Sequence, residues 1–340
     1  MSVRNKSHFT LTWTVACTLL MVSCQKKETY RLEGTVFGTL YHITYIGKDN
    51  LQQEIDDKLA EFDLSLSTFN QKSTISAFNQ WGVEAFSLKK DPWMQHCVSR
   101  SLEISRLTDG AFDITVAPLV NVWGFGFEKS QTPTPQTIDS IRQFVGYTLL
   151  ALKADQLCKK DARLQLDCSA IAKGYACDVV GEWLKSKGIR DFLVEIGGEM
   201  VAYGKNKQGQ NWRIGINSPI DDATSTNMEF ESILQLTNKG VATSGNYRNF
   251  YVKDGKKIEH TIHPKTGYPI QQNILSATIV APDCLTADAL ATACMVMGLD
   301  QSLKLVESLS ETEGLFICAD SGKGLSTHYT KGMKLFLYNK

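Results

Sequence analysis

Hydrophobic residues recur along the chain with two different periods, and these periods separate predicted helices from predicted strands. Leu51, Ile55, Leu59 and Phe62 follow spacings of three and four residues, as one face of an amphipathic helix does. Comparable patterns predict further helices over 92–108, 138–144, 169–187 and 286–297, and another from residue 301.

Other segments alternate between apolar and polar residues and are therefore predicted to be strands. They cover 35–45, 192–196, 212–216, 233–236, 274–281 and 315–319. Residues 250–262 predict a hairpin, because Asp254-Gly255 in the middle is a typical hairpin turn. Helices mixed with hairpin strands predict an α+β fold with a largely antiparallel sheet.

The first 24 residues are predicted to be a signal peptide rather than part of the fold. A positively charged start precedes the apolar run Phe9–Val22, which is too short to cross ~30 Å of hydrocarbon comfortably. Ser23-Cys24 directly after this run resembles the lipobox of bacterial lipoproteins, in which Cys24 would be acylated. An ordinary signal cleaved nearby and a poor transmembrane anchor are the alternatives.

This interpretation predicts three segments and a location. Residues 1–24 form the lipoprotein signal, 25–30 a polar tether, and 31–340 one folded domain. The mature protein would be lipid-anchored to a membrane of the bacterial cell envelope and would face the periplasm. Two acyl chains anchor a protein stably where one does not.

Charge and cysteine content exclude several classes of function. Lys plus Arg equals Asp plus Glu at 36 each, so no basic excess points to nucleic acid. The cysteines after Cys24 are scattered singly and form no CxxC pair, which argues against a disulfide framework or a zinc site. Most of them are expected to be buried as small apolar residues.

The predicted C-terminal helix contains a carboxylate and a hydroxyl on one face. Asp288 and Thr292 are four residues apart, and the residues between them are apolar. Two oxygen ligands presented to one point suit Mg²⁺. Alternatively, Asp288 interacts with the helix dipole and Thr292 bonds back to its own helix; the residues alone favour this simpler explanation.

A strand passes into a helix within 167–176, where free amides and Lys173 suit a phosphate group. A simple helix cap at Asp167 or Ser169 explains the same residues. Glycine-rich segments follow at 195–199 and 240–248, but neither has the context of a Rossmann or Walker A motif.

Two histidines, His260 and His263, stand three residues apart in a strand-like stretch. They are therefore expected to point to opposite faces, which argues against a shared metal ion. Either one is a candidate general base, because histidine titrates near neutral pH.

The order of these segments resembles the ApbE family over most of residues 31–300. The resemblance is carried by Gly38-Thr39, Ser67–Phe69, Gly110–Thr115 with Pro118-Leu119, Trp123–Gly126, Asp167–Asp178, Glu195–Glu199, Ala242–Tyr247, His260–Gly267 and Ala287–Thr292. It implies a T-fold-like α+β protein that acts as an FAD:protein FMN transferase. Such an enzyme uses Mg²⁺ to transfer FMN from FAD to a Thr hydroxyl of a partner protein and releases AMP. The implied partner is a membrane-associated redox subunit.

The resemblance also assigns individual residues. Mg²⁺ would be held by Asp288, Thr292 and the backbone carbonyl of Ala170. The acceptor hydroxyl needs a base, and His260 is our candidate for it. The implied FAD contacts are Phe37, Phe69, Ala111, Phe112, Asp113, Asp167, Lys173, Ser244 and the backbone of Ile262.

Four positions depart from the family pattern. Phe37 stands where Met is frequent and Phe69 where Tyr is frequent, and both are expected to stack on an aromatic ring. His263 and Asn246 occupy positions where Asp is frequent.

Two other activities fit the same residues. Water in place of the Thr hydroxyl would make the protein an FAD pyrophosphatase. A non-catalytic flavin-binding lipoprotein is the third alternative, although storage of FAD does not require a phosphoryl-transfer apparatus.

Overall fold

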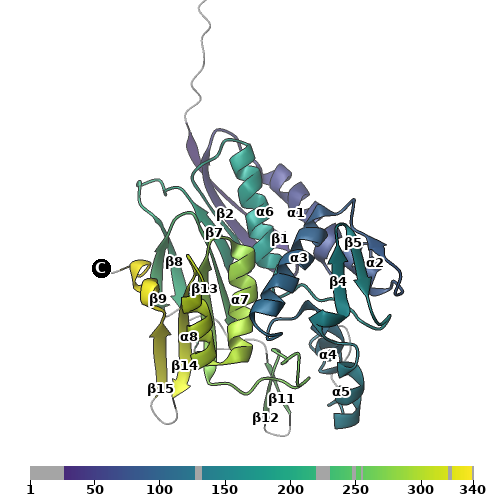
Figure 1. Cartoon of the computed structure of the whole chain (residues 1–340). Helices are drawn as coiled ribbons and strands as arrows, with labels where there is room; N and C mark the ends of the chain where they lie inside the picture. Colours follow the sequence, from purple (N-terminus) through teal and green to yellow (C-terminus); the bar gives the residue numbers. More distant parts are fainter. Residues whose placement is uncertain are drawn as a thin grey trace, which may run out of the picture.

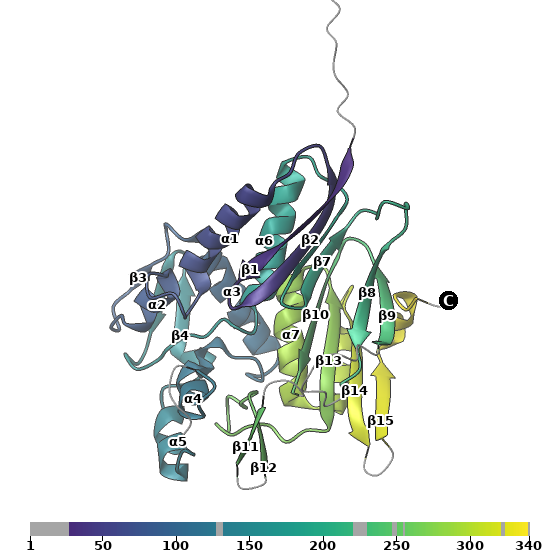
Figure 2. The ribbon, with the colours of Figure 1, turned by 180° about the vertical axis from the view of Figure 1, so that it is seen from behind.

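The computed structural model describes residues 27–126, 132–219, 230–246, 250–253, 256–320 and 324–338. Within these ranges the main element is an eight-stranded sheet (Figure 2). Its strand order is β1 (Glu28–Val36), β2 (Thr39–Gly47), β6 (Phe192–Ile196), β7 (Glu199–Tyr203), β10 (Lys239–Gly245), β13 (Ile274–Ala281), β14 (Glu313–Asp320) and β15 (Gly324–Tyr329). Every neighbouring pair is antiparallel, which confirms the predicted α+β class.

Helices cover one face of this sheet (Figure 1). They are α1 (Gln52–Leu66), α3 (Pro92–Leu107), α6 (Ala172–Ser186), α7 (Cys284–Met297) and α8 (Leu299–Ser308). α7 is buried on nearly all sides, because it packs against β10, β13 and α6. Its apolar sequence, without a polar stripe, reflects that central position.

The opposite face of the sheet is covered by a two-stranded ribbon, β8 (Trp212–Asn217) with β9 (Phe230–Leu236). Trp212, Ile214 and Leu234 of the ribbon pack with Val241 and Leu315 of the sheet in a second core. The central strands β13 and β14 are therefore buried on both faces, and they contain apolar runs rather than strict alternation.

A smaller lobe of short elements lies beside the helices. It contains α2 (Thr74–Asn79), a three-stranded sheet of β3 (Phe86–Ser87), β5 (Gln156–Lys159) and β4 (Leu150–Lys153), the 3-10 helices η1 (Ile114–Val116) and η2 (Tyr147–Leu149), α4 (Ala117–Val122) and α5 (Pro135–Arg142). Leu119, Trp123, Ile138 and Ile262 form a separate small core beneath α4 and α5. The 3-10 helix η3 (Lys331–Leu335) follows β15 near the C-terminus.

The predicted helices and most predicted strands are present, but several boundaries differ. The strand predicted over 35–45 is two strands, since the chain reverses at Phe37-Gly38, where φ is positive at both residues (52° and 72°). Two positive φ values are typical of a two-residue hairpin turn. β1 begins at Glu28, inside the predicted tether. β7, β10, β15 and the small lobe's strands were not predicted.

The hairpin predicted over 250–262 is formed by β11 (Phe250–Lys253) and β12 (Lys256–Glu259), and its predicted turn at residues 254–255 lies outside the described residues. β12 ends at Glu259, so His260 and His263 do not share a strand. The predicted signal peptide and Cys24 also lie outside the described residues. None of the described helices is long and apolar enough to cross a membrane.

Candidate functional site

A cavity of about 1330 Å³ lies where the small lobe, the start of α6, the face of α7 and the ends of several sheet strands meet. Almost all the residues predicted for the site line it. They are Phe69, Ala111, Phe112, Asp113, Asp167, Ala170, Lys173, Ser244, His260, Ile262, Asp288 and Thr292. These residues come from segments up to 220 positions apart, which the fold brings to one place.

Phe37 is the exception, because it does not line the cavity. It lies in the turn between β1 and β2, where its ring packs against Phe62 with the ring centroids 5.7 Å apart. Phe69, by contrast, lines the cavity and is 73% exposed. Of the two predicted aromatic contacts, only Phe69 is placed to meet a ring in the cavity.

The close approach of α6 to α7 positions the carboxylate of Asp288. A Cβ atom at Gly174 would lie 2.3 Å from the carbonyl oxygen of Cys284, so only glycine allows this contact. The amide of Gly174 donates to Oδ2 of Asp288 (3.0 Å). Asp288 is buried and lines the cavity together with Thr292, as their four-residue spacing predicted.

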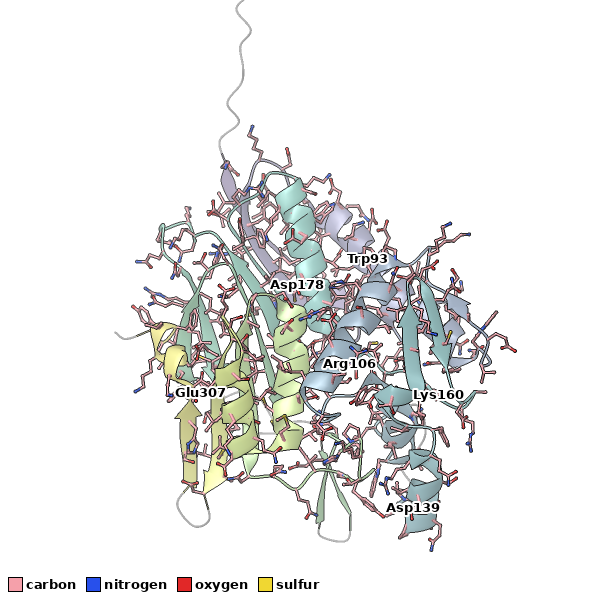
Figure 3. The ribbon with its side chains drawn as sticks, in the orientation of Figure 1. Trp93, Arg106, Asp139, Lys160, Asp178 and Glu307 are labelled. Carbon is pink, nitrogen blue, oxygen red and sulfur yellow. The ribbon has the colours of Figure 1, made fainter. Side chains whose placement is uncertain are left out.

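The start of α7 is fixed by two carboxylates. Asp283 accepts a hydrogen bond from the amide of Thr286 (2.7 Å) and caps the helix. Asp178 of α6, labelled in Figure 3, accepts from the amides of Cys284 (2.9 Å) and Leu285 (2.8 Å). Burial raises the pKa of Asp178 to about 7, although these amides oppose the shift. The "Asp167–Asp178" motif therefore ends in a structural residue.

Lys173 and Glu199 form an ion pair inside the cavity, with Nζ 2.5 Å from Oε1. The stem of Lys173 passes Gly197, where a Cβ atom would lie 3.2 Å from its Cδ. Burial alone lowers the pKa of Lys173, but the carboxylates of Asp288 and Glu199 outweigh it and raise the pKa above its ordinary value. Lys173 therefore carries a full positive charge.

The two carboxylates beside Lys173 have raised pKa values. For Glu199, burial and the nearby Asp288 raise the pKa to about 7, against the lowering effect of Lys173. For Asp288, burial raises the pKa, against Lys173 and the amide of Gly174. When all three groups are ionised the cluster has one excess negative charge, which favours a cation in the cavity.

Asp113 lines the cavity but its carboxylate is already bonded to the protein. Oδ1 accepts from the amide (2.8 Å) and hydroxyl (2.7 Å) of Thr115, and Oδ2 accepts from the amide of Tyr147 (2.7 Å). Burial raises the pKa of Asp113 despite these bonds. The residue thus ties η1 to η2 and shapes the cavity wall beside Phe112.

The loop before α6 faces the cavity through its backbone. Asp167 accepts from the amide of Ser169 (2.8 Å), and the helix begins at Ala172, three residues later than predicted. No side chain caps this helix start, where Ile171 is the capping residue. Neither predicted cap therefore forms. The loop leaves Asp167 and Ala170 at the cavity wall.

His260 and His263 have different surroundings. His260 lines the cavity, and its ring lies 6.3 Å from that of Phe125 in an edge-on arrangement. His263 instead accepts a hydrogen bond at Nδ1 from the amide of Lys265 (3.2 Å). Burial and the charge of Lys265 lower the pKa of His263, so the neutral ring needed for this bond is favoured. An Asp at this position would accept the same bond, which accounts for the departure from the family pattern.

Asn246 also has a structural explanation. Its Nδ2 donates to Glu259 (2.8 Å), and its Oδ1 accepts from the hydroxyl of Thr261 (2.8 Å). These bonds connect the end of β10 to the residues on both sides of His260. A carboxylate in place of the amide would face Glu259 without a proton to donate, so the amide fits this position better.

The donor set at α7 suits a hard divalent cation. Carboxylate, hydroxyl and backbone carbonyl oxygens, available from Asp288, Thr292 and Ala170, are the ligand types that Mg²⁺ takes. Within the described residues, no group of three or more His, Cys, Asp or Glu side chains is arranged so that it could hold a metal ion.

Sequence reasoning named Glu199 only within a motif and missed its ion pair. The pair joins residues 26 positions apart across a helix and a strand, so no local periodicity reports it. The one hint in the sequence was the Gly197-Gly198 pair directly before Glu199, because paired glycines allow another segment to approach the backbone closely at the end of a strand.

Known proteins match this chain over nearly its full length. The ApbE family model matches residues 37–316. An FAD:protein FMN transferase from Vibrio cholerae is 37% identical over 322 residues, which cover 91% of this chain and 95% of that protein. The protein of the same name from Escherichia coli strain K12 is 33% identical, with 98% of each chain covered.

Solved structures agree with this match. The flavin transferase ApbE from Vibrio cholerae superposes with a TM-score of 0.81 and 36% identity, covering 92% of this chain and all of that one. The apo form of the flavinyl transferase ApbE from Pseudomonas stutzeri gives a TM-score of 0.82 and 33% identity, covering 93% of this chain and 98% of that chain. The predicted ApbE architecture is thereby confirmed.

Proposed function

This chain belongs to the ApbE family, and we propose that it transfers FMN from FAD to a protein. We propose further that the acceptor is a Thr hydroxyl of a membrane-associated redox subunit, that AMP is released, and that Mg²⁺ is required. The observation that supports this best is that one cavity is lined both by His260, the candidate general base, and by Asp288 and Thr292 of α7, the candidate cation ligands.

The reaction exchanges the phosphoanhydride bond of the FAD diphosphate for a phosphoester bond to Thr. The Thr oxygen forms a bond to the phosphorus on the FMN side of FAD, the bond from that phosphorus to the bridging oxygen breaks, and AMP leaves with that oxygen. His260 takes the proton of the Thr hydroxyl, because an alcohol is a poor nucleophile while protonated. A magnesium ion, when bound, stabilises negative charge on the diphosphate.

The protein's own groups position the substrate. Asp288, Thr292 and Ala170 would hold the cation, and Lys173 would supply a positive charge for the diphosphate. Phe69 offers exposed apolar surface for the flavin ring, and Ala111 and Phe112 line the same cavity. The cavity volume of about 1330 Å³ is sufficient for a dinucleotide of this size.

The predicted lipid anchor completes the proposal. With Cys24 acylated, the enzyme is held at the membrane on the periplasmic side, where a membrane-associated acceptor is available. The Ser23-Cys24 pair directly after the apolar run Phe9–Val22 supports this location.

The function is tested by mixing the purified protein with FAD, Mg²⁺ and a candidate acceptor, followed by intact-mass analysis of both proteins and an assay for AMP. We expect the acceptor to gain the mass of FMN in step with AMP. The same experiment with Asp288→Ala should give no transfer while circular dichroism shows an intact fold. FMN and AMP released without acceptor modification would instead identify an FAD pyrophosphatase, and FAD bound without turnover a storage protein.

A further inference from the structure

Glu199 is a buried carboxylate of the cavity to which the proposed reaction gives no role. It is 4% exposed and begins β7 directly after the Gly197-Gly198 turn. Oε1 pairs with Lys173, whereas Oε2 is buried and has no hydrogen-bond partner among the described residues. Burying a carboxylate with one unsatisfied oxygen is costly, so its retention at the cavity wall requires a reason.

Lys173 has two carboxylates within electrostatic reach, Glu199 and Asp288. It precedes Gly174, whose amide already bonds to Asp288, so the lysine side chain starts beside that carboxylate. Its flexible stem nevertheless runs past Gly197 to Glu199. A lysine ammonium is a mobile point charge that pairs with whichever carboxylate is nearest and ionised.

We propose that Glu199 is a positioning residue that holds Lys173 away from Asp288 and so keeps the Asp288 carboxylate available to a divalent cation. This inference rests on the proposed function, which assigns Asp288 to the cation. Without Glu199, the partly buried ammonium of Lys173 would lack its partner, and pairing with Asp288 would be the nearest way to compensate its charge. Lysine would then compete with the cation for the same oxygens.

The test is a double-mutant cycle read by cation binding rather than by activity. Mn²⁺ is titrated into the full-length protein without FAD, and free Mn²⁺ is measured by electron paramagnetic resonance for the parent, Glu199→Gln, Lys173→Met and the double variant. We expect Glu199→Gln to weaken Mn²⁺ binding by about tenfold, a coupling typical of contacting residues. In the Lys173→Met background the same substitution should change binding less than twofold, because the competing ammonium is gone.

Three results decide between the explanations. Equal weakening by Glu199→Gln with and without Lys173 would mean that Glu199 acts on the cation by its own charge, which overturns the inference. No weakening in either background also overturns it, while leaving the proposed function intact if Asp288→Asn abolishes binding. Mn²⁺ binding that is indifferent to Asp288→Asn overturns the proposed cation site and the inference with it.

A second variant, Glu199→Asp, controls for misfolding. Glu199→Asp keeps the charge but shortens the reach of the side chain. It should therefore fold, and its affinity for Mn²⁺ should lie between those of the parent and Glu199→Gln. Thermal unfolding of each variant is followed by circular dichroism. A loss in Glu199→Asp that persists unchanged when Lys173→Met is added would contradict the competition between Lys173 and the cation.

Discussion

His260 is the single residue on which the chemistry of transfer is expected to depend most. His260→Asn should lower the rate of acceptor modification by about 10²–10⁴-fold, the usual contribution of general base catalysis. FAD binding, measured by flavin fluorescence, should be unchanged because the diphosphate contacts lie elsewhere. Weaker FAD binding with an unchanged maximal rate would make His260 a ligand contact, and a loss confined to His263→Asn would transfer the role to His263.

The amide of Asn246 bridges Glu259 and Thr261 on either side of His260, so its charge matters. Asn246→Asp should lower both the melting temperature and the transfer rate, because two carboxylates would then face each other. Adding Glu259→Gln restores a donor and should recover most of both losses. If Asn246→Asp is as stable as the parent, or if Glu259→Gln brings no recovery, the bridge is not the cause.

His263 makes the loop after it sensitive to acid. Its pKa is lowered, so the neutral ring contributes stability that is complete above the ordinary pKa of about 6.5 and is lost as the pH falls below it. His263→Asp should keep the bond to the Lys265 amide down to about pH 4, where aspartate protonates. Its melting temperature should therefore fall less than that of the parent between pH 7.5 and 5. His263→Ala should be less stable at neutral pH, and a parallel decline in all three proteins would be evidence against this role.

Among the elements, the contact between α6 and α7 has the least tolerance for change. Gly174→Ala would place a methyl group 2.3 Å from the carbonyl oxygen of Cys284, so the helices must separate. We expect a loss of about 1–3 kcal/mol in the free energy of unfolding, typical of overpacking, despite the better helix propensity of alanine. Cation binding should weaken as well, because the amide of Gly174 holds Asp288.

Gly181→Ala is the matched control for this prediction, since it lies on the same helix and its nearest contact is a side-chain methyl of Val201 at 3.1 Å. In urea unfolding, Gly181→Ala should lower the free energy of unfolding less than Gly174→Ala does. Equal stability of the two variants would show that the α6–α7 contact can relax without cost.

The longer elements could be predicted from the sequence because each has a regular apolar face. α3 begins at Pro92 as predicted. α7 was also predicted, except that it begins at Cys284 rather than residue 286, directly after its capping residue Asp283. Apart from α5, the small lobe could not be predicted, because its helices and strands are short and are held by contacts with other segments. β1 and β2 merged in the prediction because the turn residue Phe37, at φ 52°, has no sequence signature of a turn.

The same distinction holds for the site. Asp288 and Thr292 share a helix face, so their spacing was enough to place them together. The pairing of Lys173 with Glu199, and the tertiary bonds of Asn246 and Asp113, depend on the global fold. Apart from Phe37, the residues named from the sequence line the cavity, but the sequence did not show how their charges are paired.

For the whole molecule, attachment to the membrane depends on a residue outside the fold. Cys24→Ala should release the protein from the membrane fraction and abolish labelling with a radioactive or clickable fatty acid. The purified variant should retain FAD-dependent transfer, because the described domain begins at Lys27. Unchanged fractionation and labelling in Cys24→Ala would rule out the lipoprotein assignment.

β1 begins at Glu28, four residues after Cys24, so a lipid anchor at Cys24 would set the distance between the enzyme and the membrane. Its nine residues rise about 3.3 Å each, so its two ends are about 30 Å apart. The end distant from the anchor lies beside the turn at Gly197, which borders the cavity and bonds to Leu40 of β2. A strand directed away from the bilayer would hold the cavity well above the lipid surface. Only acceptors whose target segment extends into the space above the membrane could then be reached, so accessibility would select substrates alongside recognition of their sequence.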